Sequence, residues 1–242
     1  RVLFRSFDTI VLQSEKELWG ISEWVKQNNS INLYLQNSPA IKIAEDFMSS
    51  VVPVGVSQEV WIEWKNRINK YFKEFGRTAY EFDFAHSTPQ ETLTPTFESV
   101  KTFVEGKGES PFLRQTTFEK RRKHAEEEIL QHIGGLRKKL FFKLLHWAQE
   151  TSPMRENAIY LMGMGHPLIR CMFQEISERF IRGGAISHLD DIYWLTKSEL
   201  EVLIEQLDKN KSLSDMNGII PVRKAELKKY MGYVSPSKLP ER

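Results

Sequence analysis

The sequence predicts an all-α protein, an irregular multi-helix domain with one long loop-rich excursion. Apolar residues recur at spacings of three and four along most of the chain, which is the period of one helix face. Ser or Thr residues, several with Glu three positions later, stand where such segments begin. No run of alternating apolar and polar residues is bounded by hairpin turns, so no β-sheet is expected.

The first third of the chain contains three predicted helix starts. Ser14 forms a capping box with Glu17, and an apolar face follows. Ser38 is followed by a proline, which favours the first helical position. Ser57 opens a longer helix rich in aromatic residues, and Gly76 is its natural end.

Residues 77–117 form the loop-rich excursion. Thr88 and Thr94 each precede a proline, which predicts two short helical turns. The segment 105–111 contains two glycines and a proline and is expected to be an exposed loop. It makes 105–116 the candidate division of the domain into two lobes.

The longest helical pattern runs from Thr117 to Glu150. Gly134 and Gly135 are expected to bend or break this helix. Its apolar residues step by three and four, which predicts one continuous buried stripe. The stripe consists of Ile129, Ile133, Leu136, Leu140, Leu144 and Trp147.

Three further helices are expected after residue 150. Ser152 and the proline after it predict a helix start, the segment Gly165-His166-Pro167 predicts a kink, and the glycine pair at 183–184 predicts the end. Thr196 caps the next helix with a Glu three residues later. Pro221 begins the last helix, which ends near residue 231.

Composition excludes several classes of protein. A net charge of +2 gives no overall field for nucleic acid, and the basic residues near 120 are interleaved with acidic ones. No apolar run approaches the ~20 residues of a membrane span. A single cysteine fits a reducing compartment, so a cytoplasmic location is expected. The six histidines lack metal-ligand spacing, and no phosphate-binding glycine loop is present.

Several short motifs occur in a specific order along the chain. They are Phe75-Gly76-Arg77-Thr78, Glu81-Phe82-Asp83, Arg155-Glu156-Asn157, and the run from Gly184 through Asp191-Ile192-Tyr193-Trp194-Leu195-Thr196 to Glu199-Leu200. From roughly Trp61 onward, the chain resembles the central helical region of phosphoenolpyruvate-synthase-like phosphotransferases, including the rifampicin phosphotransferases. It departs from that pattern at Thr78, which follows Arg77 without a preceding histidine.

The resemblance implies a parent enzyme with an ATP-grasp domain and a mobile phosphohistidine domain, which use ATP and Mg²⁺. Residues 1–234 would be its central helical domain, which binds a small-molecule acceptor. Residues 235–242 would be a linker to the phosphohistidine domain. The region contains neither reaction centre, so no cofactor and no catalytic residue are expected in this chain. Two alternatives stay open: a non-catalytic scaffold that docks the mobile domains, and an unrelated helical interaction module.

A polar cluster with aromatic neighbours follows the helix end at Gly76. It consists of Arg77, Glu81 and Asp83, which form either a buried ion pair that braces the fold or a wall of the acceptor cavity. Arg155 is expected in the first turn of a helix, where a cation needs an anionic partner. That partner is either one of the carboxylates of this cluster or a phosphate that arrives on the histidine of the phosphohistidine domain.

The kinked helix after residue 152 has a surface rich in aromatic and thioether groups. Such a surface usually forms core, because methionine fills irregular gaps. In rifampicin-type relatives, however, the acceptor lies in a largely apolar helical pocket. We therefore also expect Tyr160, Met164 and Phe173 to line the acceptor site, in a cavity shared with the segment that carries Arg77.

Overall fold

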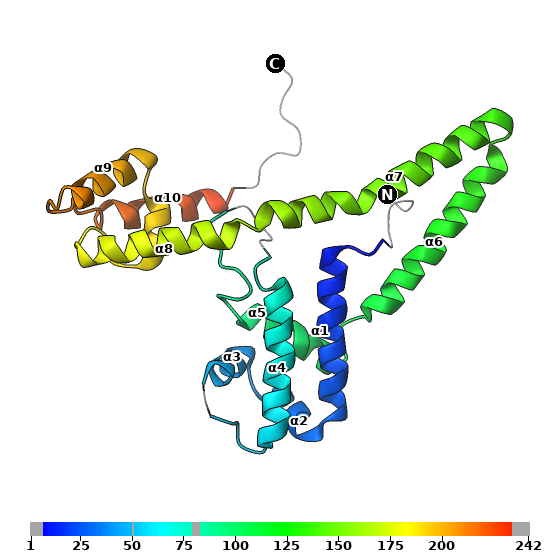
Figure 1. Cartoon of the computed structure of the whole chain (residues 1–242), viewed down its shortest axis with the longest axis horizontal. Helices are drawn as coiled ribbons and strands as arrows, with labels where there is room; N and C mark the ends of the chain where they lie inside the picture. The colour runs from blue at the N-terminus through cyan, green and yellow to red at the C-terminus, as the bar shows by residue number, and fades with distance from the viewer. Residues whose placement is uncertain (1–6, 50, 79–82, 234–242) are drawn as a thin grey trace. The chain divides into compact units, whose positions relative to one another are not determined.

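A computed structural model describes residues 7–49, 51–78 and 83–233 (Figure 1). Throughout these three ranges the backbone forms helices and turns without a β-strand, so the predicted all-α class is confirmed.

The contacts of the chain group it into two compact units. Unit 1 comprises Arg1–Phe82 and Ser87–Gly165, and unit 2 comprises Asp83–His86 and His166–Arg242. Residues 105–116, the candidate division from the sequence, lie inside unit 1.

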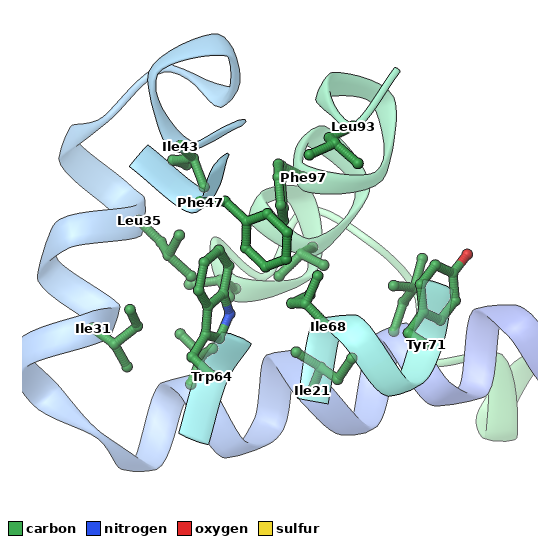
Figure 2. Packing of buried hydrophobic residues seen from close by; sticks show 14 of the residues in the cluster. Ile21, Ile31, Leu35, Ile43, Phe47, Trp64, Ile68, Tyr71, Leu93 and Phe97 are labelled. Carbon is green, nitrogen blue, oxygen red and sulfur yellow. The ribbon is translucent and has the colours of Figure 1, made fainter. Parts of the chain in front are cut away.

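Unit 1 is built around an aromatic core (Figure 2). Five of its helices enclose that core: α1 (Ile10–Gln27), α2 (Asn29–Asn37), α3 (Ala40–Met48), α4 (Gln58–Phe75) and α5 (Thr94–Val104). The ring of Trp64 on α4 lies 5.7 Å from Phe47 on α3 and 5.4 Å from Phe97 on α5, measured between centroids. All three side chains are buried, so α3, α4 and α5 meet at Trp64.

The predicted limits of α4 are confirmed. The Ser57 hydroxyl accepts a hydrogen bond from the Val60 amide, and the helix ends at Phe75 before Gly76. The predicted start of the first helix at Ser14 is wrong, because Thr9 is the N-cap residue. Ser14 lies buried inside α1, where its hydroxyl is 2.8 Å from the Tyr71 hydroxyl on α4.

Helix α5 corrects the prediction of a short turn at Thr94. It has 11 residues, and its side chains Phe97, Val100 and Val104 are buried in the core of unit 1. This tertiary packing extends the helix beyond what its local start signal predicts. At Thr88 the chain forms a turn, in which the Thr88 amide donates to the Glu91 carboxylate at 3.0 Å.

The long helical pattern forms two helices, α6 (Pro111–His132) and α7 (Gly135–Gly163). Gly135 adopts a φ of +58°, which a glycine tolerates at the break. Helix α7 continues through Pro153, so the predicted helix start at Ser152 is wrong. Arg155 therefore lies inside α7 and not in the first turn of a helix.

The predicted buried stripe on this pattern is also wrong. The exposed fractions are 85% for Leu136, 59% for Leu140, 53% for Leu144 and 65% for Trp147, whereas the neighbouring Leu145 is buried. Periodicity identifies residues that share a helix face, but it does not supply the element that covers the face.

Unit 2 contains α8 (His166–Arg182), a 3₁₀ helix η2 (Leu189–Trp194), α9 (Lys197–Asp208) and α10 (Ile219–Met231). Its buried core centres on Phe180, Ile192 and Leu203. The predicted end of α8 at the 183–184 glycine pair and the predicted capping box of α9 are confirmed. The last helix begins two residues before Pro221.

The acidic residues between Asp190 and Glu199 stabilise unit 2. Asp191 is buried, and its carboxylate accepts hydrogen bonds from the Ser187 and His188 amides and from Lys224. Burial alone would raise the pKa of Asp191, but these hydrogen bonds together hold it below the usual value. Glu199 accepts two hydrogen bonds from the Arg223 guanidinium, at 2.7 and 2.8 Å.

The buried side chains of α2 should contribute to the stability of unit 1. We expect Leu35→Ala to lower the free energy of unfolding by about 2–5 kcal/mol, because Leu35 is 1% exposed and its removal leaves a cavity. Leu33→Ala, on the same helix but 51% exposed, is the matched control and should change it by less than ~1 kcal/mol. Urea denaturation followed by tryptophan fluorescence measures both, and equal losses would contradict the assignment of this core.

The Glu199–Arg223 pair should make the stability of unit 2 depend on pH. Hydrogen bonds from Arg223 lower the pKa of Glu199 from 4.5 to about 2. The stabilisation is therefore complete above pH 4.5 and disappears as the pH falls toward about 2. Near neutral pH, Glu199→Gln should lower the free energy of unfolding by about 1 kcal/mol. The difference in the free energy of unfolding between this variant and the wild type should shrink below pH 4.5.

The control for this experiment is Glu201→Gln on the same helix, whose side chain is 63% exposed. It should show little effect in thermal melts recorded across the same pH series. A destabilisation by Glu199→Gln that stays constant down to the lowest pH would contradict the role of this ion pair.

Candidate functional site

Among the described residues, four of the predicted site residues belong to unit 1. Arg77 is exposed in the turn that follows α4, and Arg155 lies on α7. The Tyr160 hydroxyl on α7 donates to the Glu74 carbonyl oxygen at 3.3 Å, so it reaches the last turn of α4 next to Arg77. Met164 follows the end of α7 and is 60% exposed.

Two predicted residues belong to unit 2. The Asp83 carboxylate accepts a hydrogen bond from the Ala85 amide at 2.9 Å, and the Asp83 carbonyl oxygen accepts one from His166 Nε2 at 3.1 Å. The Phe173 ring lies 6.0 Å from Phe84 and 5.8 Å from Tyr193, measured between centroids. These contacts give both residues a structural role within unit 2.

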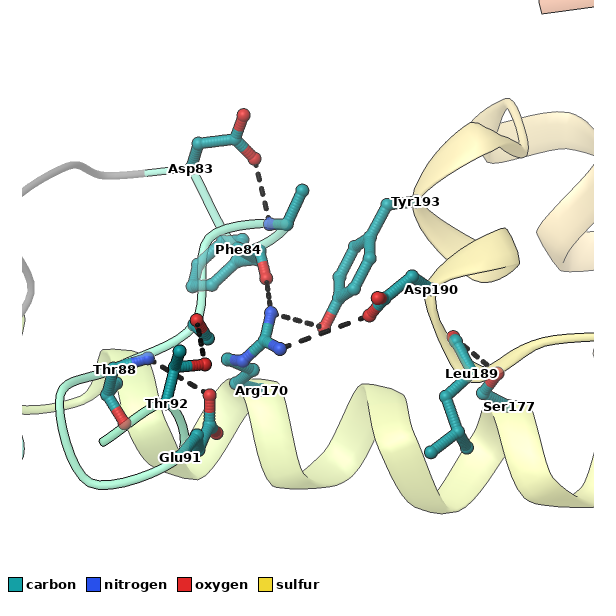
Figure 3. Close-up of polar contacts among 12 residues, drawn as sticks. Asp83, Phe84, Thr88, Glu91, Thr92, Arg170, Ser177, Leu189, Asp190 and Tyr193 are labelled. Atoms are coloured by element: carbon teal, nitrogen blue, oxygen red, sulfur yellow. Dashed lines mark hydrogen bonds and ion pairs between the residues drawn. The ribbon is translucent and has the colours of Figure 1, made fainter. Parts of the chain in front are cut away.

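Arg170, which the sequence interpretation missed, organises these contacts (Figure 3). It is only 5% exposed, and it donates to the Phe84 carbonyl oxygen and to the Tyr193 hydroxyl. Its guanidinium lies 4.0 Å from the Asp190 carboxylate. Arg170 thereby connects α8, η2 and the segment 83–86. No local pattern in the sequence indicates these partners, which are far apart along the chain.

Glu81 lies outside the described residues. Arg77 and Asp83 are both exposed, so the alternative of a buried ion pair is wrong for these two. The hypothesis of a cavity shared by the Arg77 segment and the kinked helix stays a prediction.

A cavity of about 520 Å³ in unit 1 includes Arg155 in its wall. It is formed by the start of α1, the first half of α6 and the middle of α7. Its lining residues are Phe7, Thr9, Val11, Leu12, Arg114, Gln115, Phe118, Ser152, Arg155 and Glu156. Arg155 forms no ion pair with any residue that the structure describes, whereas Arg114 pairs with Glu15. The cavity thus combines an apolar wall with a guanidinium that has no carboxylate partner within the described residues.

A second cavity of about 410 Å³ lies in unit 1, and the sequence interpretation missed it. It is formed by α1, the end of α4, the turns before α5, and α5. Hydroxyl groups are frequent in its wall: those of Ser14, Tyr71, Ser87, Thr88, Thr92, Thr96 and Ser99. The high frequency of Ser and Thr between residues 87 and 99 is the feature of the sequence that could have indicated this cavity. Several of these hydroxyls already bond to one another, as in the pair of Thr92 and Ser87 at 2.7 Å.

The methionine-rich surface is not core, contrary to the structural expectation. Met162 and Met164 of unit 1 are 70% and 60% exposed, and Met172 of unit 2 is 59% exposed. Exposed thioether and aliphatic side chains of this kind form adaptable binding surfaces.

Within residues 7–49, 51–78 and 83–233, no three His, Cys, Asp or Glu side chains are grouped so that they could hold a metal ion. None of the helices in those ranges has both the length and the apolar character to cross a bilayer.

A protein-family model matches the chain. No curated protein matches the chain. The family model described as the rifampicin phosphotransferase fourth domain matches residues 2–156, which is more than half of the chain and includes Arg77 and Arg155. The matched range also contains every residue that lines the cavity beside Arg155. The chain therefore belongs to the rifampicin phosphotransferase fourth-domain family.

Proposed function

We propose that this chain is the acceptor-binding helical domain of an ATP-dependent phosphotransferase. A phosphohistidine domain outside the chain would transfer the β-phosphate of ATP to the acceptor. The observation that carries the proposal is the cavity of about 520 Å³ with Arg155 in its wall, within the range that matches the family. Cavities that bind drug-sized molecules typically measure ~300–1,000 Å³ and combine apolar surface with a few polar groups.

The lining of this cavity suits an acceptor with an apolar body and a polar reacting end. Phe7, Val11 and Phe118 offer apolar surface. Glu156 can accept a hydrogen bond from an acceptor hydroxyl. Arg155 can neutralise negative charge on the acceptor or on the phosphate that reaches it, which is what phosphoryl transfer requires of a cation.

The other predicted residues contribute to the proposal to different degrees. Arg77, Tyr160 and Met164 are candidates for orienting the acceptor where α4 and α7 end. Asp83 and Phe173 have structural contacts that account for their positions. ATP and Mg²⁺ would act in the domains outside this chain.

A second candidate function is a helical scaffold that docks the mobile domains without contacting the acceptor. The exposed methionines Met162 and Met164 favour it, because a docking surface needs accessible apolar area. The two functions differ in what they require of Arg155.

In the intact parent enzyme, Arg155→Ala should lower phosphate transfer to the acceptor by about 10- to 100-fold, the effect of losing one charge-assisted hydrogen bond. Labelling of the phosphohistidine by ATP should persist, because that step takes place in other domains. Arg121→Ala, an exposed arginine on α6, is the matched control and should leave both steps unchanged. Unchanged transfer and unchanged acceptor affinity in Arg155→Ala would reject the acceptor site and favour the scaffold.

The isolated chain should not become phosphorylated by ATP. It contains no phosphate-binding glycine loop and no histidine in the Thr/Ser-x-His context of the phosphohistidine domain. The test is to incubate the chain with ATP labelled at the β- or γ-phosphate. The label bound to the protein is then counted before and after acid treatment. Stoichiometric label on any of the six histidines would contradict it.

A further inference from the structure

We propose that α7 pairs with the α7 helix of a second copy of this chain, in antiparallel orientation and through its exposed apolar stripe. The stripe is defined as Leu140, Leu144, Trp147, Thr151, Met154, Ala158 and Leu161. The proposed acceptor site uses Ser152 and Glu156 on the other side of α7, whereas Arg155 lies at the edge of the stripe, four residues after Thr151 and three before Ala158.

The stripe has the spacing of a helix-pairing surface. Leu140, Trp147, Met154 and Leu161 follow one another at intervals of seven residues, and Leu144, Thr151 and Ala158 repeat the same interval beside them. The four residues of the first series are 59%, 65%, 63% and 62% exposed, in the order given. An uninterrupted series of this kind fits another helix better than it fits a compact small molecule.

The opposite side of α7 is already used within unit 1. Leu145 is buried, and Ser152 and Glu156 line the cavity beside α1 and α6. At 3.6 residues per turn, these positions point away from Leu140 and Trp147. Helix α7 is therefore apolar on two sides, of which the described part of the chain covers one.

The charges beside the stripe favour an antiparallel second copy. Lys143 and Glu150 lie one heptad apart beside the stripe, on the flank away from Ser152 and Glu156. A parallel pair leaves Lys143 of the two copies at the same level. An antiparallel pair brings Lys143 of one copy to the level of Glu150 of the other.

The residue order also gives a consistent register. We place the Trp147 side chains of the two copies near the two-fold axis. A residue that lies a given number of positions before Trp147 in one copy then faces the residue that lies the same number of positions after Trp147 in the other copy. Leu140 then faces Met154 of the second copy, and Leu144 lies beside Thr151, so large side chains meet smaller or flexible ones. Lys143, which forms no ion pair with a described residue of its own chain, comes next to Glu150. Glu150 is accessible for this, since its only partner among the described residues is His146, at 3.1 Å on the exposed surface.

The oligomeric state of the 242-residue chain tests the proposal directly. Sedimentation velocity over a wide range of concentrations should show a reversible dimer. Trp147→Glu should raise the dimer dissociation constant by about 100-fold or more, because it places a charge at the centre of the apolar stripe. Ile41→Glu on α3 is the matched control, since Ile41 is 61% exposed but lies on another helix, and it should leave the dimer unchanged.

A charge exchange tests the orientation. Lys143→Glu and Glu150→Lys should each raise the dissociation constant by about 10-fold, and the double variant should restore it, because both interchain pairs are re-formed with reversed charges. Far-ultraviolet circular dichroism should be the same for all variants. A chain that stays monomeric at every concentration, including one that binds a helical peptide or anionic vesicles as a monomer, would overturn the proposal. So would single variants that weaken the dimer without rescue in the double variant.

Discussion

The packing of Trp64 against Phe47 and Phe97 is the constraint on which unit 1 depends. These rings come from α3, α4 and α5, and their centroids lie 5.4–5.7 Å apart around Trp64. Ile21 of α1 belongs to the same buried cluster, so the cluster also fixes α1 (Figure 2). Aromatic side chains of this size bury ~150–250 Å² each, so such a cluster removes a large apolar area from water.

Fixing α1 in this way positions the cavity beside Arg155 and the hydroxyl-rich cavity of unit 1. Val11 lines both of them, so the start of α1 forms a common wall. The ion pair between Glu15 and Arg114 lies at the same wall, with Glu15 lining one cavity and Arg114 the other. The proposed acceptor site thus depends on a core that contacts no acceptor, because the core holds the helix that separates the two cavities.

The acidic residues of the motif between Asp190 and Glu199 have a structural role in unit 2. Asp190 and Asp191 are adjacent acidic residues in the motif, and one lies beside Arg170 whereas the other accepts hydrogen bonds from amides and Lys224. Glu199 is bonded to Arg223. Each carboxylate thus has a cation or amide partner within the unit, and for the buried Asp191 these partners offset the cost of burying a charge. The motif that carried part of the family resemblance therefore stabilises the fold.

Local signals in the sequence determined the helical class, the limits of α4, the end of α8 and the cap of α9. These features depend on residues a few positions apart, such as Ser57 with the amide of Val60. The motif that contains Arg155 also indicated a residue that now lines a cavity. Only the tertiary structure decided which apolar faces are covered, because burial depends on neighbours distant in the chain. The spacing of Leu140 and Trp147 predicts a shared face correctly, but no described element of this chain packs on it. The same reason explains Arg170, whose partners Phe84 and Tyr193 approach it only after folding.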